Sequence, residues 1–298
     1  MNHRMWPKPG HLLEALTKLD FYVNTDMFWS EASKAADLVL PACTSYEREE
    51  VQAKPGGRFY FSGRAVEPLG EAKNDIQIIM EVMKRMGLED EVLSHGYEAY
   101  MQYILKPSGL TLEELKSHPE GMLGKNIYPA AERTYEKEPF ATPSGKAEIR
   151  SLVLERYADS HGYSGLPVYR DFREISGVDQ ERYPLILNTG SRKPQFFHSR
   201  VYWVSWLAGI EDAPLVEIHP EDGKKYGIED GAMVRVESPA GELTAKAAWH
   251  VGGKPGVVYI YHGSPQGDAN ELIGKDYLDP ISGFPGFKSY FCRIERAL

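Results

Sequence analysis

The feature that most constrains the fold of this chain is a series of short apolar segments after about residue 180. They are YPLILN at 183–188, LVEI at 215–218, MVRVE at 233–237, ELTAKAAW at 242–249, VVYIY at 257–261 and YFCRIE at 290–295. Turn residues separate them at intervals of about 8–12 residues, which is typical of β-sandwiches and barrels. A short helix is predicted at 220–226. We expect six strands and one small helix to form a compact closed barrel.

The first forty residues show a different pattern, in which predicted helices alternate with predicted strands. The leucines of HLLEALTKL at 11–19 fall on one helical stripe, and FYVNTDMF at 21–28 contains a short strand. Ser30 is a suitable N-cap for a helix in SEASKAA, and LVL at 38–40 is an apolar strand that Pro41 ends. Such apolar strands are typical of a parallel sheet that is covered on both faces.

This α/β unit is incomplete by itself. Two parallel strands with two helices cannot cover both faces of a sheet, and their edges would be left unpaired. The next hundred residues or so supply no further parallel strand. We therefore expect that this chain is a fragment or that a second chain completes the sheet.

Residues 46–169 have an irregular, mainly helical pattern. An amphipathic helix that Gly87 ends is predicted at 75–86. Further helices are predicted at 97–105 and 110–115, the last with Thr111 and Glu114 as a capping box. Glycine and proline are scattered between them. The fold class expected for the chain is therefore α/β plus β, with an α/β fragment at 1–45, a helical framework at 46–169 and the barrel at 170–298.

Composition excludes several classes of protein. The net charge of −9 gives no overall basic field to collect nucleic acid. Two distant cysteines, Cys43 and Cys292, form no disulfide framework, zinc site or iron–sulfur cluster within this chain. No apolar run reaches the roughly 18 residues of a membrane span, and the first residues have no signal-peptide pattern. A cytoplasmic location is the expectation.

Several segments, in order, resemble the molybdopterin-dependent oxidoreductases of the dimethyl sulfoxide reductase superfamily. VEIHPEDGKKYGIEDGAMVRVESPAGELTAKA, PGVVYIYHG and DANELI are similar to their C-terminal domain. EALTKLDFYVNTDMFWSEASKAADLVLPACTSYE resembles their helix, strand, D-x-F-x-x-E and A-D-x-V-L-P stretch. EPLGEAKNDIQIIMEVMKRMG and ATPSGKAEI are also similar to family segments. The resemblance covers nearly the whole chain, except residues 90 to 135.

The resemblance implies a double-psi β-barrel of the aspartate-decarboxylase-like type that closes over the pterin. The implied cofactor is bis(molybdopterin guanine dinucleotide) with molybdenum or tungsten, bound only in the assembled enzyme. The family's cysteine-rich iron–sulfur segment and the domain that presents the metal ligand have no counterpart here. The chain thus resembles the C-terminal portion of a metal-binding oxidoreductase, with no catalytic residue, metal ligand or iron–sulfur cluster of its own.

The first predicted cofactor loop follows the strand at 183–188. Glycine allows backbone amides to approach a ligand, hydroxyls donate hydrogen bonds, and arginine pairs with phosphate or pterin acceptors. By similarity to the family's T-G-R and following His, we predict contacts from Thr189, Gly190, Ser191, Arg192, His198 and Ser199. Family members often have Arg where this chain has Ser191, and Arg192 is the substitute.

The second and third predicted loops lie after residue 261. Asn270 and Leu272 match the family's Asn-x-Leu, whose asparagine hydrogen-bonds the pterin, and an amide both donates and accepts. The stretch 279–288 resembles the closing segment in which an aromatic residue and a lysine approach the cofactor. Phe287 and Lys288 are therefore included among the predicted cofactor-binding residues.

Other candidate groups have simpler interpretations. Asp26 follows a strand where α/β folds bind nucleotides, and a capping or solvated role is equally compatible. Glu217, His219 and Asp222 are interpreted as a strand leading into a helix start and not as metal ligands. The aromatic residues at 196–206 either line a substrate funnel or, as we favour, lie on an amphipathic helix that packs on a neighbour.

Three functions remain open from the sequence. The leading hypothesis is a molybdopterin-binding part of an oxidoreductase, inactive alone and completed by a catalytic, iron–sulfur-containing partner chain or by self-association. The second is a non-catalytic binding or structural module on the same barrel. The third is an inactive truncated gene product. Substrate, metal and oligomeric state do not follow from these residues.

Overall fold

A computed structural model describes residues 3–125, 136, 138–190, 193–199, 201–210, 213–274 and 278–297 of the chain. Its residue contacts divide it into two compact units. The barrel unit contains Met1–Tyr22, Ser30–Ala36 and Glu148–Leu298, and the framework unit contains Val23–Trp29 and Asp37–Ala147. This division groups the N-terminal helices with the barrel. The domain boundaries at 45 and 169 that were predicted from the sequence stay predictions.

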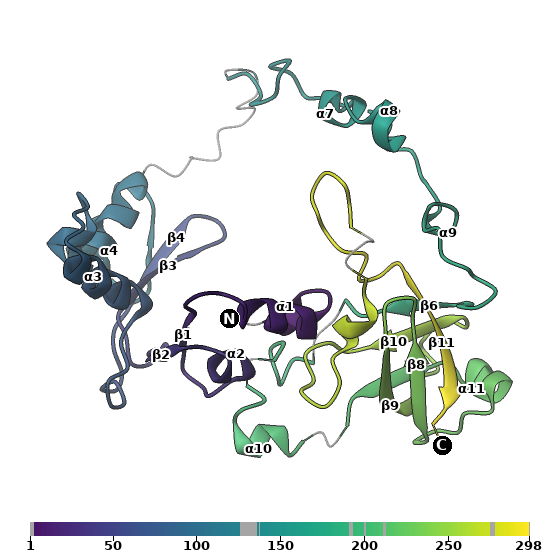
Figure 1. The fold of residues 1–298 in the computed structure, drawn as a ribbon. Coiled ribbons are helices and arrows are strands. Elements are labelled where there is room, and N and C mark those ends of the chain that lie inside the picture. Colours follow the sequence, from purple (N-terminus) through teal and green to yellow (C-terminus); the bar gives the residue numbers. More distant parts are fainter. Residues whose placement is uncertain are drawn as a thin grey trace. The chain divides into compact units, whose positions relative to one another are not determined.

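The barrel unit is built on six strands that close on themselves in the order β10-β6-β11-β8-β9-β7 (Figure 1). The strands are β6 (Leu185–Asn188), β7 (Leu215–Ile218), β8 (Met233–Glu237), β9 (Glu242–Trp249), β10 (Val257–Ile260) and β11 (Tyr290–Arg296). Two pairs, β10 with β6 and β7 with β9, are parallel, and the other four are antiparallel. The predicted closed barrel is therefore confirmed, with mixed pairing.

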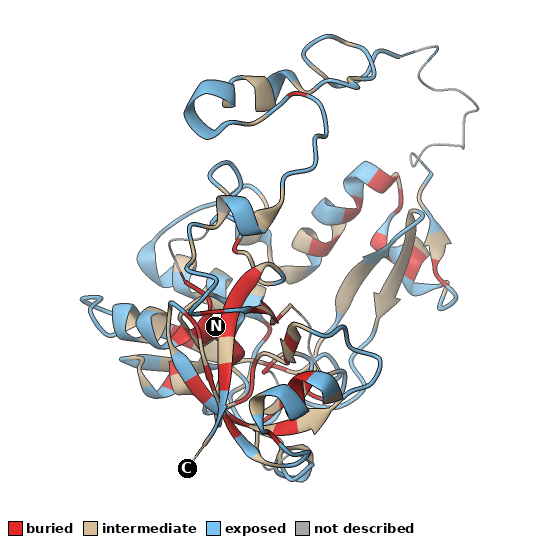
Figure 2. Cartoon of the chain, turned by 90° about the vertical axis from the view of Figure 1, so that its right-hand side faces the viewer, coloured by how far each residue is buried: buried red, intermediate tan, exposed pale blue. Residues whose placement is uncertain are grey.

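Alternate residues of the barrel strands point inward and form its core. In β6, Leu185 and Leu187 are buried, and in β10, Val258 and Ile260 are buried. Figure 2 shows the buried positions gathered on these strands. All eighteen buried residues of this core lie between Leu185 and Ile294. Among the described residues, none outside this range belongs to the barrel core.

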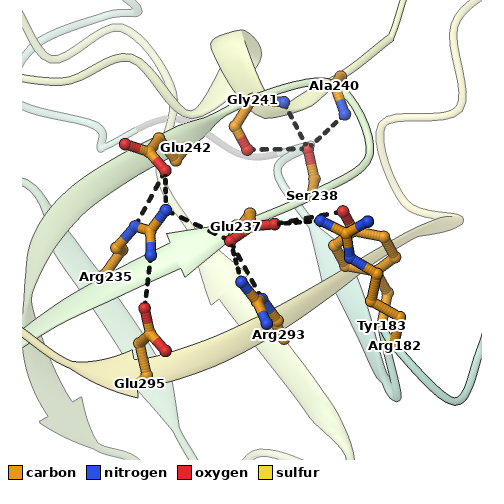
Figure 3. Close-up of polar contacts among 10 residues, drawn as sticks. All are labelled: Arg182, Tyr183, Arg235, Glu237, Ser238, Ala240, Gly241, Glu242, Arg293 and Glu295. Atoms are coloured by element: carbon orange, nitrogen blue, oxygen red, sulfur yellow. Dashed lines mark hydrogen bonds and ion pairs between the residues drawn. The ribbon is translucent and has the colours of Figure 1, made fainter.

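An ion-pair network lies on the outside of the barrel (Figure 3). Glu237 on β8 accepts hydrogen bonds from Arg293 on β11, at 3.0 Å from Nε, and from Arg182 at 3.1 Å. Arg235 binds both Glu242 on β9 and Glu295 on β11. The Arg293 hydrogen bonds lower the pKa of Glu237. Because the arginines are solvent-exposed, the network specifies strand pairing more than it stabilises the fold.

The barrel unit also contains short helices. They are η1 (His3–Met5), α1 (Pro9–Leu16), α2 (Glu31–Lys34), α7 (Leu152–Glu155), α8 (Ala158–His161), α9 (Phe172–Ile175), α10 (Ser205–Ala208), α11 (Pro220–Tyr226) and η4 (Ala269–Leu272). As predicted, the Ser30 side chain caps α2 by accepting a hydrogen bond from Ser33 N at 3.3 Å. The helix predicted at 220–226 is confirmed as α11.

The framework unit contains the predicted pair of parallel strands, β1 (Val23–Asp26) and β2 (Leu38–Pro41), with Val23 opposite Leu38. Among the described residues these two strands form a two-stranded sheet. Val23 is 40% exposed and Leu38 is 44% exposed. Two apolar strand residues therefore remain partly in water, as expected for a sheet with too few neighbours.

The framework unit also contains the predicted helices and a sheet that the sequence analysis did not predict. The helices are α3 (Asp75–Met86), α4 (Tyr97–Leu105) and α5 (Leu112–Lys116), with short η2 (Leu93–His95) and η3 (Lys106–Ser108). The antiparallel strands β3 (Glu50–Lys54), β4 (Arg58–Ser62) and β5 (Met122–Leu123) pair in that order. Phe59 and Phe61 of β4 pack against the core of α4 and α5. The sequence marks the turn between β3 and β4 with Pro55, Gly56 and Gly57, which lie between two extended segments.

We predict that residues 170–298 unfold in one cooperative transition when expressed alone, because the whole barrel core lies within them. Denaturant unfolding followed by circular dichroism and tryptophan fluorescence should give coincident curves. Residues 1–169, which lack this core, are the matched control and should give a broader transition. A broad, probe-dependent transition for 170–298 would refute the boundary at 170.

Candidate functional site

The predicted cofactor loops meet at one end of the barrel. The parallel strands β6 and β10 both end there, and β11, antiparallel to β6, begins there. The loops after Asn188 and Ile260 and the segment before Tyr290 are therefore neighbours. Barrel closure brings together residues that are about a hundred positions apart in the sequence.

Thr189 and Gly190 of the first loop lie against Phe287 and Lys288 of the third. Thr189 is fully buried, and its backbone N–H donates to Phe287 O at 2.7 Å. A Cβ on Gly190 would lie 2.7 Å from Cε of Lys288. The lysine chain therefore crosses directly over the glycine, and any larger residue at 190 would displace it.

Two histidines connect the first loop to the second. His198 Nδ1 lies 2.6 Å from His262 Nε2, and His262 Nδ1 lies 3.2 Å from Thr189 O. When His262 donates to the carbonyl through Nδ1–H, its Nε2 accepts a hydrogen bond from His198 Nδ1–H. His262 lies in a loop that the sequence analysis identified, but it was not among the predicted site residues.

The backbone around His198 is unusual. Phe197 and His198 have positive φ values of 44° and 64°, a region that non-glycine residues rarely adopt. Gly263 packs closely here, since a Cβ on it would lie 3.1 Å from His198 O and 3.2 Å from Ser199 N. Ser199 is buried at this contact. Positive φ at non-glycine residues is often found at functional sites.

Asn270 is almost completely buried in η4 and takes part in a polar cluster. Its Nδ2 donates to Arg4 O at 2.7 Å, while its Oδ1 has no hydrogen-bond partner among the described residues. Asp268 Oδ1 accepts from Asn270 N at 2.9 Å and from Gly263 N at 3.3 Å. Arg4 and Asp268 were not predicted from the sequence, because no local pattern marks contacts between such distant residues.

Asp268 has a perturbed acidity. Burial raises the pKa of its carboxyl to about 6, and the hydrogen bond from Asn270 and the positive charge of Arg4 only partly oppose this effect. Arg4 Nη1 is 3.7 Å from Asp268 Oδ2, an ion pair too long for a hydrogen bond. The carboxylate is therefore only partly compensated.

The structure describes seven of the nine predicted cofactor-binding residues, and they lie in the segments after β6, after β10 and before β11. Ser191 and Arg192 lie outside the described residues. The other seven are Thr189, Gly190, His198, Ser199, Asn270, Phe287 and Lys288. Their role toward a cofactor stays a prediction.

Comparison with known proteins gives the family. Residues 185–291 match the family model described as Molydopterin dinucleotide binding domain, and residues 4–85 match the one described as Molybdopterin oxidoreductase. Acetylene hydratase of Syntrophotalea acetylenica is 31% identical over an alignment 300 residues long, which covers 93% of this chain and 40% of that protein. The chain belongs to the molybdopterin oxidoreductase family.

Other relatives agree with this membership. The F420-dependent formate dehydrogenase subunit alpha of Methanocaldococcus jannaschii is 29% identical over 97% of this chain and 41% of its own length. The solved structure of acetylene hydratase from Pelobacter acetylenicus superposes with a TM-score of 0.83 at 27% identity, over 98% of this chain and 42% of that one. The chain thus spans about 40% of these relatives and carries the dinucleotide-binding domain of the molybdopterin oxidoreductases.

Two acidic residues and one histidine near α11, which we interpreted as structural, make local hydrogen bonds. Glu217 accepts a hydrogen bond from Tyr261 at 3.1 Å, His219 Nδ1 accepts from Glu221 N at 3.2 Å to cap α11, and Asp222 accepts from Gly256 N at 2.7 Å. Within the described residues, no three His, Cys, Asp or Glu side chains are grouped to hold a metal ion.

The interpretation of residues 196–206 as an amphipathic helix is wrong. Its described residues before α10 form turns, in which Phe196 is buried and stacks on Tyr202 with ring centroids 3.9 Å apart. Trp206, on the single turn of α10, is 78% exposed. The reason is the positive φ at Phe197 and His198, which interrupts any helix.

Two further features bear on the sequence-based expectations. Asp26 Oδ1 accepts a hydrogen bond from Phe28 N at 3.2 Å, which is a local turn contact. Among the described residues, the structure has no helix that is both long and apolar enough to cross a bilayer.

We predict a pH-dependent cost of the Asp268 charge. Because its folded pKa of about 6 exceeds the unfolded value, the protonated carboxyl favours the folded state below pH 4, and this contribution is lost as pH rises through 6. The free energy of unfolding of the native chain should therefore fall relative to Asp268→Asn by up to about 3 kcal/mol between pH 4 and pH 7. Urea unfolding at a series of pH values measures this difference.

The control is Val251→Ala, which changes an exposed residue of the barrel unit that has no ionisable side chain. Its difference from the native chain should stay nearly constant over the same pH range. If the difference between the native chain and Asp268→Asn does not change with pH, the acidity of Asp268 is not perturbed in the folded chain.

Proposed function

We propose that this chain binds molybdopterin guanine dinucleotide through the loops at the end of its barrel. The observation that carries the proposal is the buried Oδ1 of Asn270, an acceptor without a hydrogen-bond partner among the described residues. A buried acceptor left unpaired costs about 1–3 kcal/mol, which a ligand N–H would recover. The pterin ring system offers such N–H groups.

The other described residues fit the same ligand. Gly190 leaves room for the aliphatic chain of Lys288, whose ammonium group supplies a positive charge for phosphate. Thr189, His198 and His262 form a hydrogen-bonded series that fixes the position of the first loop relative to the second. Ser199 and Phe287 complete this set of predicted contacts, and Ser191 and Arg192 are included on the family resemblance.

The proposed cofactor is the bis form with molybdenum or tungsten, which supplies two-electron or oxygen-atom chemistry when bound. The role of this chain is to bind and orient the pterin dinucleotide and to exclude water from it. We place the metal ligand and any iron–sulfur cluster in another part of the enzyme. On this proposal the chain alone has no turnover, and it acts in the cytoplasm with a catalytic partner.

Partial exposure of the β1–β2 sheet supports the proposal of a partner. Val23 and Leu38 are apolar and opposite each other, and each is about two-fifths exposed. One relative is named as the alpha subunit of a formate dehydrogenase, which indicates that it assembles with other subunits. The identity of the substrate is left open, since the relatives named above act on different molecules by name.

Retention of the dinucleotide by the full chain tests the proposed function. Molybdopterin guanine dinucleotide, released anaerobically from a purified molybdoenzyme, is mixed with the chain and separated by gel filtration. The pterin that stays with the protein is measured by fluorescence after oxidation. We expect Asn270→Ala to lower retention about tenfold, the loss of one hydrogen bond in a desolvated site.

Asn74→Ala is the matched control, because Asn74 is also a buried asparagine but caps α3 in the framework unit. It should retain pterin like the native chain. Equal retention by the native chain and Asn270→Ala would remove Asn270 from the site, and no retention by the native chain would refute the proposed function.

We predict that the chain without a partner associates with itself through its exposed strand residues. Multi-angle light scattering after gel filtration should show species larger than one chain, and Val23→Lys with Leu38→Lys should shift them toward the monomer because charge opposes edge pairing. Exchanging two exposed residues of the barrel unit, Val251→Lys and Ile210→Lys, is the control. A native chain that stays monomeric would contradict the prediction.

A further inference from the structure

The N-terminal strap, defined as residues 3–10, is joined by hydrogen bonds to the Asn270 loop, defined as residues 263–272. The bonds are Arg4 Nη1 to Ser264 O at 3.1 Å, Asn270 Nδ2 to Arg4 O at 2.7 Å, Lys8 N to Asn270 O at 3.0 Å and Gly10 N to Glu271 Oε1 at 2.6 Å. These bonds reach both the backbone and the side chains of the loop. The loop therefore depends on residues far outside the barrel sequence for its conformation.

Arg4 is the charged centre of this contact. Its side chain is only 11% exposed, so its guanidinium needs opposite charge nearby. Glu31, the first residue of α2, accepts from Arg4 Nη2 through both carboxylate oxygens, at 2.6 and 2.5 Å. Asp268 in the Asn270 loop lies on its other side, at 3.7 Å from Nη1. Arg4 thus connects α2 to the loop through a buried charge.

Glu31 explains a motif whose role the sequence analysis did not assign. It is the final residue of the D-x-F-x-x-E pattern formed with Asp26 and Phe28. Hydrogen bonds from His3 and then from Arg4 lower the pKa of Glu31 to about 2, although partial burial acts in the opposite direction. The carboxylate is therefore ionised at neutral pH and available to hold Arg4 in place.

The Arg4 backbone determines which way the Asn270 amide faces. A side-chain amide has one donating nitrogen and one accepting oxygen, and its two orientations exchange their positions. Because Asn270 Nδ2 donates to Arg4 O, the opposite atom, Oδ1, is the one left for another partner. Reversal of the amide would place Oδ1 against the Arg4 carbonyl, two acceptors together.

We propose that Arg4, held by Glu31, is a positioning residue that fixes the Asn270 loop and the orientation of the Asn270 amide for the cofactor. The inference rests on the proposed function for its ligand, but not for the loop contact itself. Preorganisation of this kind improves affinity because the loop does not have to be ordered when the ligand binds. Arg4 itself needs no contact with the ligand.

The test uses the full chain, the pterin dinucleotide retention assay and three variants. Arg4→Met keeps much of the side-chain length but removes the charge and the donors, and we expect about tenfold weaker retention. Arg4→Lys keeps a positive charge for Glu31 and should be intermediate. Arg235→Met removes an arginine from the ion-pair network outside the barrel and should bind like the native chain. Circular dichroism and a cooperative melt verify that each variant is folded.

A double-mutant cycle separates positioning from a general loss of stability. If Arg4 acts through Asn270, then Arg4→Met should change retention less than about twofold when Asn270 is already alanine. An undiminished tenfold loss in that background would overturn the inference, as would native-like retention by Arg4→Met in the otherwise native chain.

Hydrogen exchange keeps this test separate from the proposed function. If the native chain retains no pterin, the proposed function fails, and the amides of residues 263–272 then decide the inference. We expect about tenfold faster exchange of these amides in Arg4→Met than in Arg235→Met, with Arg4→Lys between them. Equal exchange in Arg4→Met and Arg235→Met would overturn the role of Arg4. If Arg4→Met does not fold, Arg4→Lys and Glu31→Gln are used in its place. Native-like exchange of the amides of residues 263–272 in both variants would then overturn the role of Arg4.

Discussion

Closure of the barrel is the constraint on which the candidate site depends. The parallel pair of β6 and β10 makes the residues after Asn188 and after Ile260 leave the barrel at the same end. In a purely antiparallel barrel of neighbouring hairpins, loops from strands so distant in sequence would not be placed together in this way. The inward residues of the same strands form the core, so the stability of the barrel and the position of its loops have one cause.

The polar cluster beside those loops is a cost that the barrel core has to offset. Burying Arg4, Asp268 and Asn270 together leaves one atom of each without a hydrogen-bond partner among the described residues. Apolar residues of similar size would give a more stable contact, as is common for buried ion pairs. A cluster of this type is expected where a polar partner is to be received, and this agrees with a binding site better than with a purely structural contact.

The sequence predicted the fold where the signal was local or periodic. The six barrel strands, the capping of α2 by Ser30 and the end of α3 at Gly87 all follow from residues a few positions apart. The β3–β4 hairpin was not predicted, although Pro55, Gly56 and Gly57 mark its turn, because it lies in a stretch of the sequence whose pattern is mainly helical. Prediction of the site was limited for a different reason. Family motifs indicated Asn270, but the residue that holds its side chain, Arg4, is 266 positions away. No periodicity or spacing rule links such positions, so only the folded chain reveals them as one group.

The separation between Arg4 and Asn270 has a consequence for the order of assembly during synthesis. The strap leaves the ribosome before its partner loop, which is made more than 250 residues later. Until residues 263–272 are made, Arg4 and Glu31 therefore have no Asn270 loop to contact. Closing so long a loop is entropically costly and slow, so the strap should dock after the barrel strands have paired. The candidate site would thus be completed as one of the last steps of folding.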